Sequence, residues 1–281
     1  MACKMVNIIP IFLILLSTLL SSSHGNAVES PLCGGRVFVE NTVVIEAPVH
    51  EHCYWDIQTQ DDRILVITAL NGNLKEAQDF LAIHDGSSKE SPILLVENQR
   101  MHEVSRKDMP EAVYTTQSTA SIRFKKAPTS NLQLKIQKAV DCPFNLGTAS
   151  QCGRVIDDVS CYCASFTERS QTDQRVYCYN HNMKLLSLET FEKEQAIHAA
   201  WGYGARFWTS LTDAIYEGTW YWESTDTALL PGYSHWCYRK PDDAGLFGGE
   251  DCMIINYESD GCWNDANCDN DKFDAICQAL P

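Results

Sequence analysis

The sequence predicts a two-domain protein, in which an all-β sandwich is followed by an α+β domain with long, disulfide-stapled loops. Apolar and polar residues alternate with period two in much of the stretch from residue 33 to residue 138, as in half-buried β-strands. At Asp141-Cys142-Pro143 the composition changes to one rich in Cys, Trp, Tyr and Gly. Twelve of the thirteen cysteines follow the first 25 residues. An even number of cysteines in an oxidising compartment indicates disulfides.

Residues 1–25 have the features of a signal peptide. One lysine near the start precedes an apolar run from Ile8 to Leu20, and small residues follow up to Gly25. This order is typical of a cleaved secretory signal. The run is shorter than the roughly 20 apolar residues that span a bilayer, and no later segment approaches that length. We therefore expect a secreted, extracellular protein without a membrane anchor.

The formal net charge of -15 limits the partners of the chain. Nucleic acids and anionic membranes are bound through clustered Lys and Arg side chains, so we expect neither as a partner. The acidic balance suits a protein that binds hard cations, although it also serves the solubility of a secreted protein.

Residues 26–140 form the predicted all-β domain. Leucine and isoleucine alternate with polar residues over residues 132–137, and residues 63–70 form an apolar run with the composition of a strand. Another strand is expected at residues 80–83, with a turn at His84-Asp85-Gly86.

Three motifs in this half carry a resemblance to a known family. They are Cys33-Gly34-Gly35, Cys53-Tyr54-Trp55-Asp56-Ile57 and Asp79-Phe80-Leu81-Ala82-Ile83-His84-Asp85-Gly86. Together they resemble a CUB domain, which implies a Cys33–Cys53 disulfide. The resemblance also places Asp79 at the family's calcium site, but Gln117 stands where an acid is expected. We therefore interpret this half as a structural or protein-contacting module.

Residues 141–281 form the predicted α+β domain. One helix is expected around residues 172–183 and a second begins at Thr190, whose hydroxyl can cap it. Glu192 and Glu194 then favour the positive end of that helix.

Five motifs follow one another in this second half. They are Cys178 with Leu185-Leu186-Ser187-Leu188, Phe207-Trp208-Thr209-Ser210-Leu211, Gly249-Glu250-Asp251-Cys252, Trp263-Asn264-Asp265-Ala266-Asn267-Cys268 and a final Cys277. In order and spacing they resemble a C-type lectin-like domain. The whole chain resembles secreted invertebrate-type C-type lectins with an N-terminal CUB-like domain.

The lectin resemblance implies the disulfides Cys178–Cys277 and Cys252–Cys268. Cys237 and Cys262 remain near the loop that the family uses for ligands, and a bridge between them would brace it. Four cysteines at the domain entrance form two further bridges of open connectivity. These four are Cys142, Cys152, Cys161 and Cys163.

The lectin resemblance also implies calcium (Ca2+) as a cofactor, because the family's sugar-binding positions hold an ion through oxygen ligands. The corresponding residues are Lys240, Asp242, Glu250, Asn264 and Asp265. Lys240 offers no lone pair. At about 4 Å each unit of like charge costs roughly 4 kcal/mol at an effective dielectric near 20, so Lys240 must swing into solvent if calcium binds. We expect Lys240 and Asp265 to lie on a surface loop and a strand end.

A second, auxiliary calcium site is implied in the same way. Its residues are Asp213, Glu217, Asp243 and Asp251. The alternative is that these acids form a solvated face.

The resemblance further indicates which sugar is bound. Asp242 after Pro241 and the Gly-rich loop that follows are similar to galactose-binding members. Those members carry an aromatic residue where this chain has Ala244, and Phe247 can take its place against the apolar face of the sugar. Pro241 should be cis.

These features together predict a secreted, calcium-dependent lectin for galactose or N-acetylgalactosamine, with a role in innate immune recognition. The alternative is a calcium-stabilised domain that binds a protein or glycoprotein and has lost sugar binding through Lys240. We do not expect an enzyme, because the eight histidines form no metal-spaced cluster and no hydrolase motif is present.

Overall fold

The computed structural model describes residues 28–29, 33–47, 52–77, 79–95, 104–106, 108–125, 131–147, 149–245 and 249–281. The predicted signal peptide at residues 1–25 and the predicted sugar contact Phe247 lie outside the described residues. Among the described residues, no helix is long and apolar enough to cross a membrane.

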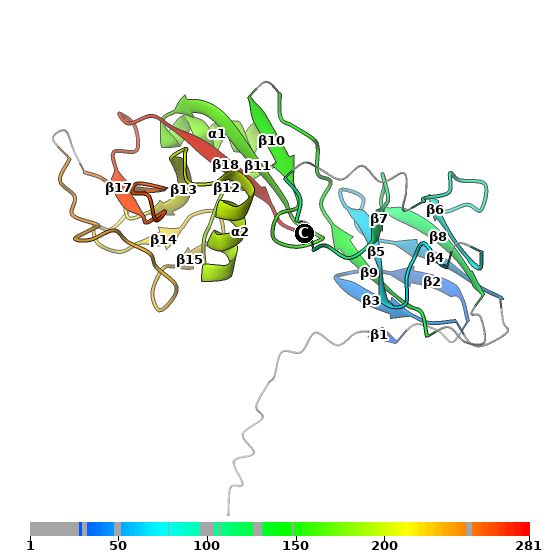
Figure 1. Ribbon diagram of the computed structural model, residues 1–281. Helices are drawn as coiled ribbons and strands as arrows, with labels where there is room; N and C mark the ends of the chain where they lie inside the picture. Colours follow the sequence, from blue (N-terminus) through cyan, green and yellow to red (C-terminus); the bar gives the residue numbers. More distant parts are fainter. Residues whose placement is uncertain are drawn as a thin grey trace, which may run out of the picture.

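The N-terminal half consists of two sheets (Figure 1). The first has the order β1 (Val28–Glu29), β3 (Thr42–Ile45), β9 (Gln133–Ala139), β5 (Ile64–Asn71) and β7 (Ala112–Tyr114). The second has the order β2 (Gly35–Phe38), β4 (His52–Gln58), β8 (Thr119–Lys125) and β6 (Leu81–Asp85).

Side chains from both sheets share one hydrophobic core. Leu134 and Ile136 of β9 are fully buried with Trp55 of β4 and Ile122 of β8. The alternation over residues 132–137 therefore reports correctly which side chains face inward, because successive side chains of a strand point to opposite faces.

The turn predicted at His84 begins later than expected. Both His84 and Asp85 pair with β8, opposite Ser121 and Ala120, so β6 continues to Asp85. Asp85 then holds the loop after β7. Its carboxylate accepts hydrogen bonds from the backbone N and Oγ1 of Thr116 at 2.9 and 2.7 Å, and its carbonyl accepts one from Gln117 Nε2 at 2.9 Å.

The C-terminal half is built on one sheet with the central order β10 (Ser150–Gly153), β11 (Cys161–Arg169), β18 (Phe273–Ala279), β13 (Phe207–Thr212), β14 (Tyr221–Trp222) and β15 (Thr227–Ala228). Short β12 (Lys184–Leu185) pairs with β18, and β16 (Cys252–Ile255) lies between β13 and β17 (Asn264–Ala266). This half therefore combines strands with few helices, as predicted.

Two helices pack beside this sheet. Helix α1 spans Gln171–Asn180 and is capped by Ser170, whose side chain accepts from Asp173 N. Helix α2 spans Phe191–Trp201, and the Thr190 side chain accepts from Lys193 N at 3.2 Å. The predicted Thr190 cap is therefore confirmed.

All six disulfides join cysteines of the described part. They are Cys33–Cys53, Cys142–Cys161, Cys152–Cys163, Cys178–Cys277, Cys237–Cys262 and Cys252–Cys268. The four pairs expected from the sequence are present, and the open connectivity at the domain entrance is now assigned.

The two halves meet at residue 140, where Val140 N donates to Val159 O at 2.9 Å. Buried Arg154 donates to the carbonyls of Val140 at 2.6 Å and Ser160 at 3.2 Å. Its guanidinium also lies 4.5 Å from the centre of the Tyr114 ring, within the range of a cation–π contact. One arginine thus connects the residue after β9, the entrance of the second half and β7.

Candidate functional site

We call the segment that begins at Cys237 and carries Lys240 and Asp242 the ligand loop. Its first residue is held beside the start of β17. Cys237 N donates to Trp263 O at 2.9 Å, and Trp263 N donates to His235 O at 2.8 Å. The Cys237–Cys262 disulfide fixes the same contact. Because Asn264 and Asp265 directly follow Trp263, this ladder brings the start of the loop beside them.

Lys240 and three of the predicted sugar-site acids converge here. We call Lys240, Asp242, Glu250 and Asp265, with Asn264 next to Asp265 in the chain, the loop cluster. The carboxylates of Asp242, Glu250 and Asp265 each offer an oxygen within 4.8 Å of the others. The Lys240–Pro241 peptide bond is cis, as expected.

Lys240 lies inside the loop cluster. Its Nζ is 2.5 Å from Asp242 Oδ1, 3.2 Å from Asp265 Oδ1 and 3.6 Å from Glu250 Oε2. The side chain is only 16% exposed. Lys240 was expected to point into solvent if calcium binds the loop. In this structure its ammonium instead lies among three carboxylates from different segments.

Burial and neighbouring charges shift the pKa values of two members of the loop cluster, Lys240 and Glu250. Burial lowers the pKa of Lys240. Its contacts with Asp242 and Asp265 raise the pKa by more than burial lowers it, so the net shift is upward. Burial raises the pKa of the Glu250 carboxyl, and the positive charge of Lys240 opposes that rise. The ammonium therefore stays charged and partly neutralises the carboxylates.

Asp265 holds the ligand loop through hydrogen bonds to its backbone. Its side chain is fully buried, and Oδ2 accepts hydrogen bonds from the backbone N of Asp242 at 2.7 Å and of Asp243 at 2.8 Å. The expectation that Asp265 lies at an exposed strand end was wrong, because β17 pairs with β16 and places Asp265 opposite buried Met253. Neighbouring Asn264 has a buried Oδ1 without a hydrogen-bond partner.

The predicted auxiliary residues form a second group, which we call the Asp213 cluster and define as Asp213, Glu217 and Asp251. Their ligand oxygens lie within 4.8 Å of one another. Asp213 follows β13, and its N donates to Asp251 O at 3.2 Å just before β16 begins. Asp243 is not part of this group. Its Oδ1 accepts from Glu250 N at 2.8 Å, so it links the two clusters instead.

The Asp213 cluster fits a divalent cation. Asp213 is only 2% exposed, yet its Oδ1 has no hydrogen-bond partner. Burial raises the pKa of Asp213, and the charge of Asp251 adds to the rise. The pKa of Glu217 is raised first by the charge of Asp213. Crowded carboxylates with an unused buried oxygen are what a calcium ion satisfies. The loop cluster fits less well, since an ammonium already lies between its carboxylates.

One residue that supports the site was missed in the sequence. Glu194 is fully buried in α2 and accepts from Trp263 Nε1 at 2.9 Å and from the Tyr233 hydroxyl. Its Oε1 also lies 3.3 Å from His235 Nδ1. The sequence indicates only a helix-start acid, because Tyr233, His235 and Trp263, which contact the carboxylate of Glu194, are at least 39 residues away.

The second half of the chain is similar to known proteins. Residues 167–279 match the family model described as Lectin C-type domain. Human C-type lectin domain family 10 member A is 33% identical over 137 residues, which cover 47% of this chain and 41% of that protein. The mouse protein of the same name is 29% identical over 202 residues, covering 65% of this chain and 64% of that protein. The chain thus spans less than two thirds of the length of these relatives.

A solved structure is also similar to this half. The mouse Scavenger Receptor C-type Lectin carbohydrate-recognition domain is 27% identical, with a TM-score of 0.37, and the match covers 43% of this chain and 88% of that one. The relatives found are C-type lectins, which are non-enzymatic carbohydrate-binding proteins.

Proposed function

Because residues 167–279 are a C-type lectin domain, we propose that this chain is a secreted carbohydrate-binding protein for galactose-type sugars. The supporting observation is the convergence of Asp242, Glu250 and Asp265 beside Asn264. Carboxylate and amide oxygens accept hydrogen bonds from sugar hydroxyls, and the amide and the ammonium of Lys240 donate them. Asp242 is 42% exposed, so a ligand can reach it.

Calcium enters this proposal at the Asp213 cluster, where it supplies positive charge when bound. Asp251 follows Glu250 directly, and Asp243 accepts from Glu250 N. Ordering the Asp213 cluster therefore orders Glu250 in the loop cluster. This connection is the basis for proposing calcium-dependent sugar binding.

The proposed location is extracellular, with residues 1–25 as the signal peptide. All twelve cysteines after residue 25 are paired, which suits an oxidising compartment. Residues 26–140 are proposed to be a CUB-like module that contacts protein, and residues 141–281 the lectin domain. Recognition of microbial glycans in innate immunity belongs to the same proposal.

Galactose-resin retention tests this function. Wild-type protein should be retained in calcium and eluted by free galactose, and a mannose resin should retain it less. Asp242→Ala should lose retention, because it removes the accessible acceptor without touching the buried anchor Asp265. Glu258→Ala removes an exposed acid outside the loop cluster and is the matched control. Equal retention of Asp242→Ala and Glu258→Ala would refute sugar binding at the loop cluster.

A second candidate function is a calcium-stabilised domain that binds protein and not sugar. The ion pairs of Lys240 favour it, because they engage the carboxylates that a sugar would use. Wild-type protein that flows through both sugar resins in calcium, yet gains thermal stability from calcium, would support this candidate.

A further inference from the structure

Lys240 lies where the loop cluster needs positive charge. Its Nζ contacts three carboxylates. It lies 2.5 Å from Asp242 Oδ1, 3.2 Å from Asp265 Oδ1 and 3.6 Å from Glu250 Oε2. Two of these oxygens, Asp265 Oδ1 and Glu250 Oε2, are buried and have no hydrogen-bond partner. For both of them, Lys240 supplies the ion pair.

The buried carboxylate of Asp265 shows why that charge matters. Asp265 Oδ2 accepts the backbone N–H groups of Asp242 and Asp243, which fixes the loop on β17. A fully buried carboxylate is costly unless it is paired and hydrogen-bonded. The hydrogen bonds satisfy Oδ2, and the ammonium of Lys240 pairs with Oδ1.

The Asp213 cluster offers a contrast within the same domain. The neighbouring charges that shift the pKa values of Asp213 and Glu217 are those of acids, with Asp251 and Asp243 acting on both. Two neighbouring acidic groups thus differ in one respect. The loop cluster contains its own cation, whereas the charges that act on Asp213 and Glu217 are negative.

We propose that Lys240 is a tethered cation that replaces a calcium ion in the loop cluster. The loop then keeps its arrangement with calcium bound only at the Asp213 cluster. The inference rests on the proposed function only in placing ligand binding at the loop cluster. A ligand there meets an ammonium that donates hydrogen bonds, in place of a metal that coordinates hydroxyls.

Counting bound calcium tests this directly, by equilibrium dialysis of the full chain at millimolar free calcium. Wild type should bind one ion. Lys240→Gln should bind one more than wild type, because it removes the ammonium and adds an amide oxygen as a ligand. Lys272→Gln makes the same charge change at an exposed site and should match wild type. Lys240→Arg retains the positive charge and should also match wild type.

Two results would overturn the inference. The first is a Lys240→Gln protein that binds no more calcium than Lys272→Gln. The second is an Asp213→Ala protein, made in the wild-type background, that still binds a calcium ion although it has lost the side-chain oxygens of residue 213. This second result decides the matter even if Lys240→Gln does not fold.

The count requires no sugar, so the two proposals fail separately. A protein with the expected counts that is not retained on galactose resin refutes the proposed function and leaves the tethered cation in place. If wild-type protein is retained on galactose resin in calcium, but Lys240→Gln and Lys272→Gln bind equal numbers of calcium ions, the tethered cation is refuted. The proposed function is then left in place.

Discussion

Glu194 of α2 supports the ligand loop from inside the domain. Its fully buried carboxylate accepts from Trp263 Nε1 and from the Tyr233 hydroxyl. The Trp263 ring lies in an aromatic group with Trp222, Tyr233 and Trp236. Since Trp263 immediately precedes Asn264 and Asp265, this one acid connects the helix to the base of the loop cluster.

Glu194→Ala should therefore destabilise the domain. A buried donor left without a partner costs about 1–3 kcal/mol, and Trp263 Nε1 would become such a donor. The half-buried Tyr233 hydroxyl would also lose its hydrogen bond. Urea unfolding followed by tryptophan fluorescence measures the free energy of unfolding. Glu192→Ala, at an exposed position in the same helical turn, should change it by less than about 0.5 kcal/mol. Similar values for the two variants would contradict this role of Glu194.

The sequence could predict which residues meet at the loop cluster but not how each one points. Asp242, Glu250 and Asp265 stand in motifs whose order indicates the site. The direction of Lys240 depends on three carboxylates from separate segments, and no motif encodes that. Glu192 and Glu194 are equivalent in the sequence, since both are acids in a first helical turn. Only the packing of α2 against Trp263 distinguishes them.

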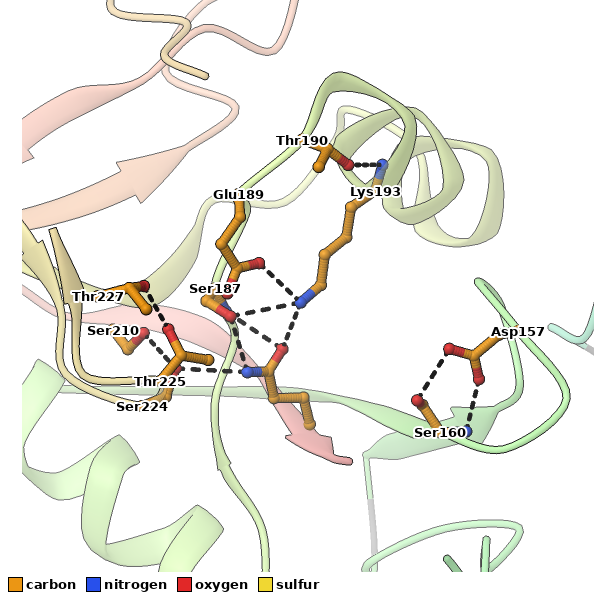
Figure 2. A network of polar contacts seen from close by, with 11 residues as sticks. Asp157, Ser160, Ser187, Glu189, Thr190, Lys193, Ser210, Ser224, Thr225 and Thr227 are labelled. Carbon is orange, nitrogen blue, oxygen red and sulfur yellow. Dashed lines mark hydrogen bonds and ion pairs between the residues drawn. The ribbon is translucent and has the colours of Figure 1, made fainter. Parts of the chain in front are cut away.

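At the scale of elements, a polar network joins α2 to β18 and to the β14–β15 turn (Figure 2). Lys193 Nζ donates to Glu189 Oε2 at 3.1 Å and to Gln278 Oε1 at 3.0 Å. Gln278 Nε2 donates in turn to Ser187 Oγ at 2.8 Å and to Ser224 Oγ at 3.3 Å. The network fixes the start of α2, and therefore Glu194, relative to the central sheet.

The Glu189–Lys193 pair should make stability depend on pH. Burial alone would raise the pKa of Glu189, but the charge and hydrogen bond of Lys193 and other hydrogen bonds lower it below the ordinary 4.5. A lowered folded-state pKa gives stability that is present above the unfolded value and lost as pH falls through the folded one. We expect Glu189→Gln to lower the free energy of unfolding by about 0.5–1 kcal/mol at pH 7.

The difference between wild type and Glu189→Gln should disappear as the pH falls through the folded-state pKa of Glu189. Urea unfolding in a series of buffers from pH 7 downward measures it. Glu192→Gln changes an exposed acid of α2 and should show no such trend. A difference that stays constant or grows toward acid pH would mean that the pair does not lower the Glu189 pKa.

Elements were predictable where local signals decide them. Period-two alternation predicts the inward face of β9, and the Thr190 hydroxyl predicts the start of α2. The end of β6 was not predictable, because His84 and Asp85 resemble turn residues and are held in the strand by pairing with β8. Long-range pairing overrides local preference in such a case.

At the scale of the molecule, the ligand loop lies far from the N-terminal half. Figure 1 shows β17 at the end of the C-terminal half opposite the N-terminal sheets, and the C-terminus near the junction of the halves. Arg154 and Arg106 hold that junction, with Arg106 Nη1 donating to Ile156 O at 2.6 Å. A composition change near residue 140 predicts a boundary, but it cannot show that these arginines cross it. The proposed glycan site is therefore separate from the N-terminal half.

We propose that the loop cluster binds galactose-type glycans when calcium is present. A glycan array probed with the full chain, once in calcium and once in chelator, tests it most directly. We predict binding to glycans that end in galactose or N-acetylgalactosamine, with the signal lost in chelator. Binding to no glycan, or equal binding to mannose-terminated glycans with and without calcium, would contradict calcium-dependent galactose binding at the loop cluster.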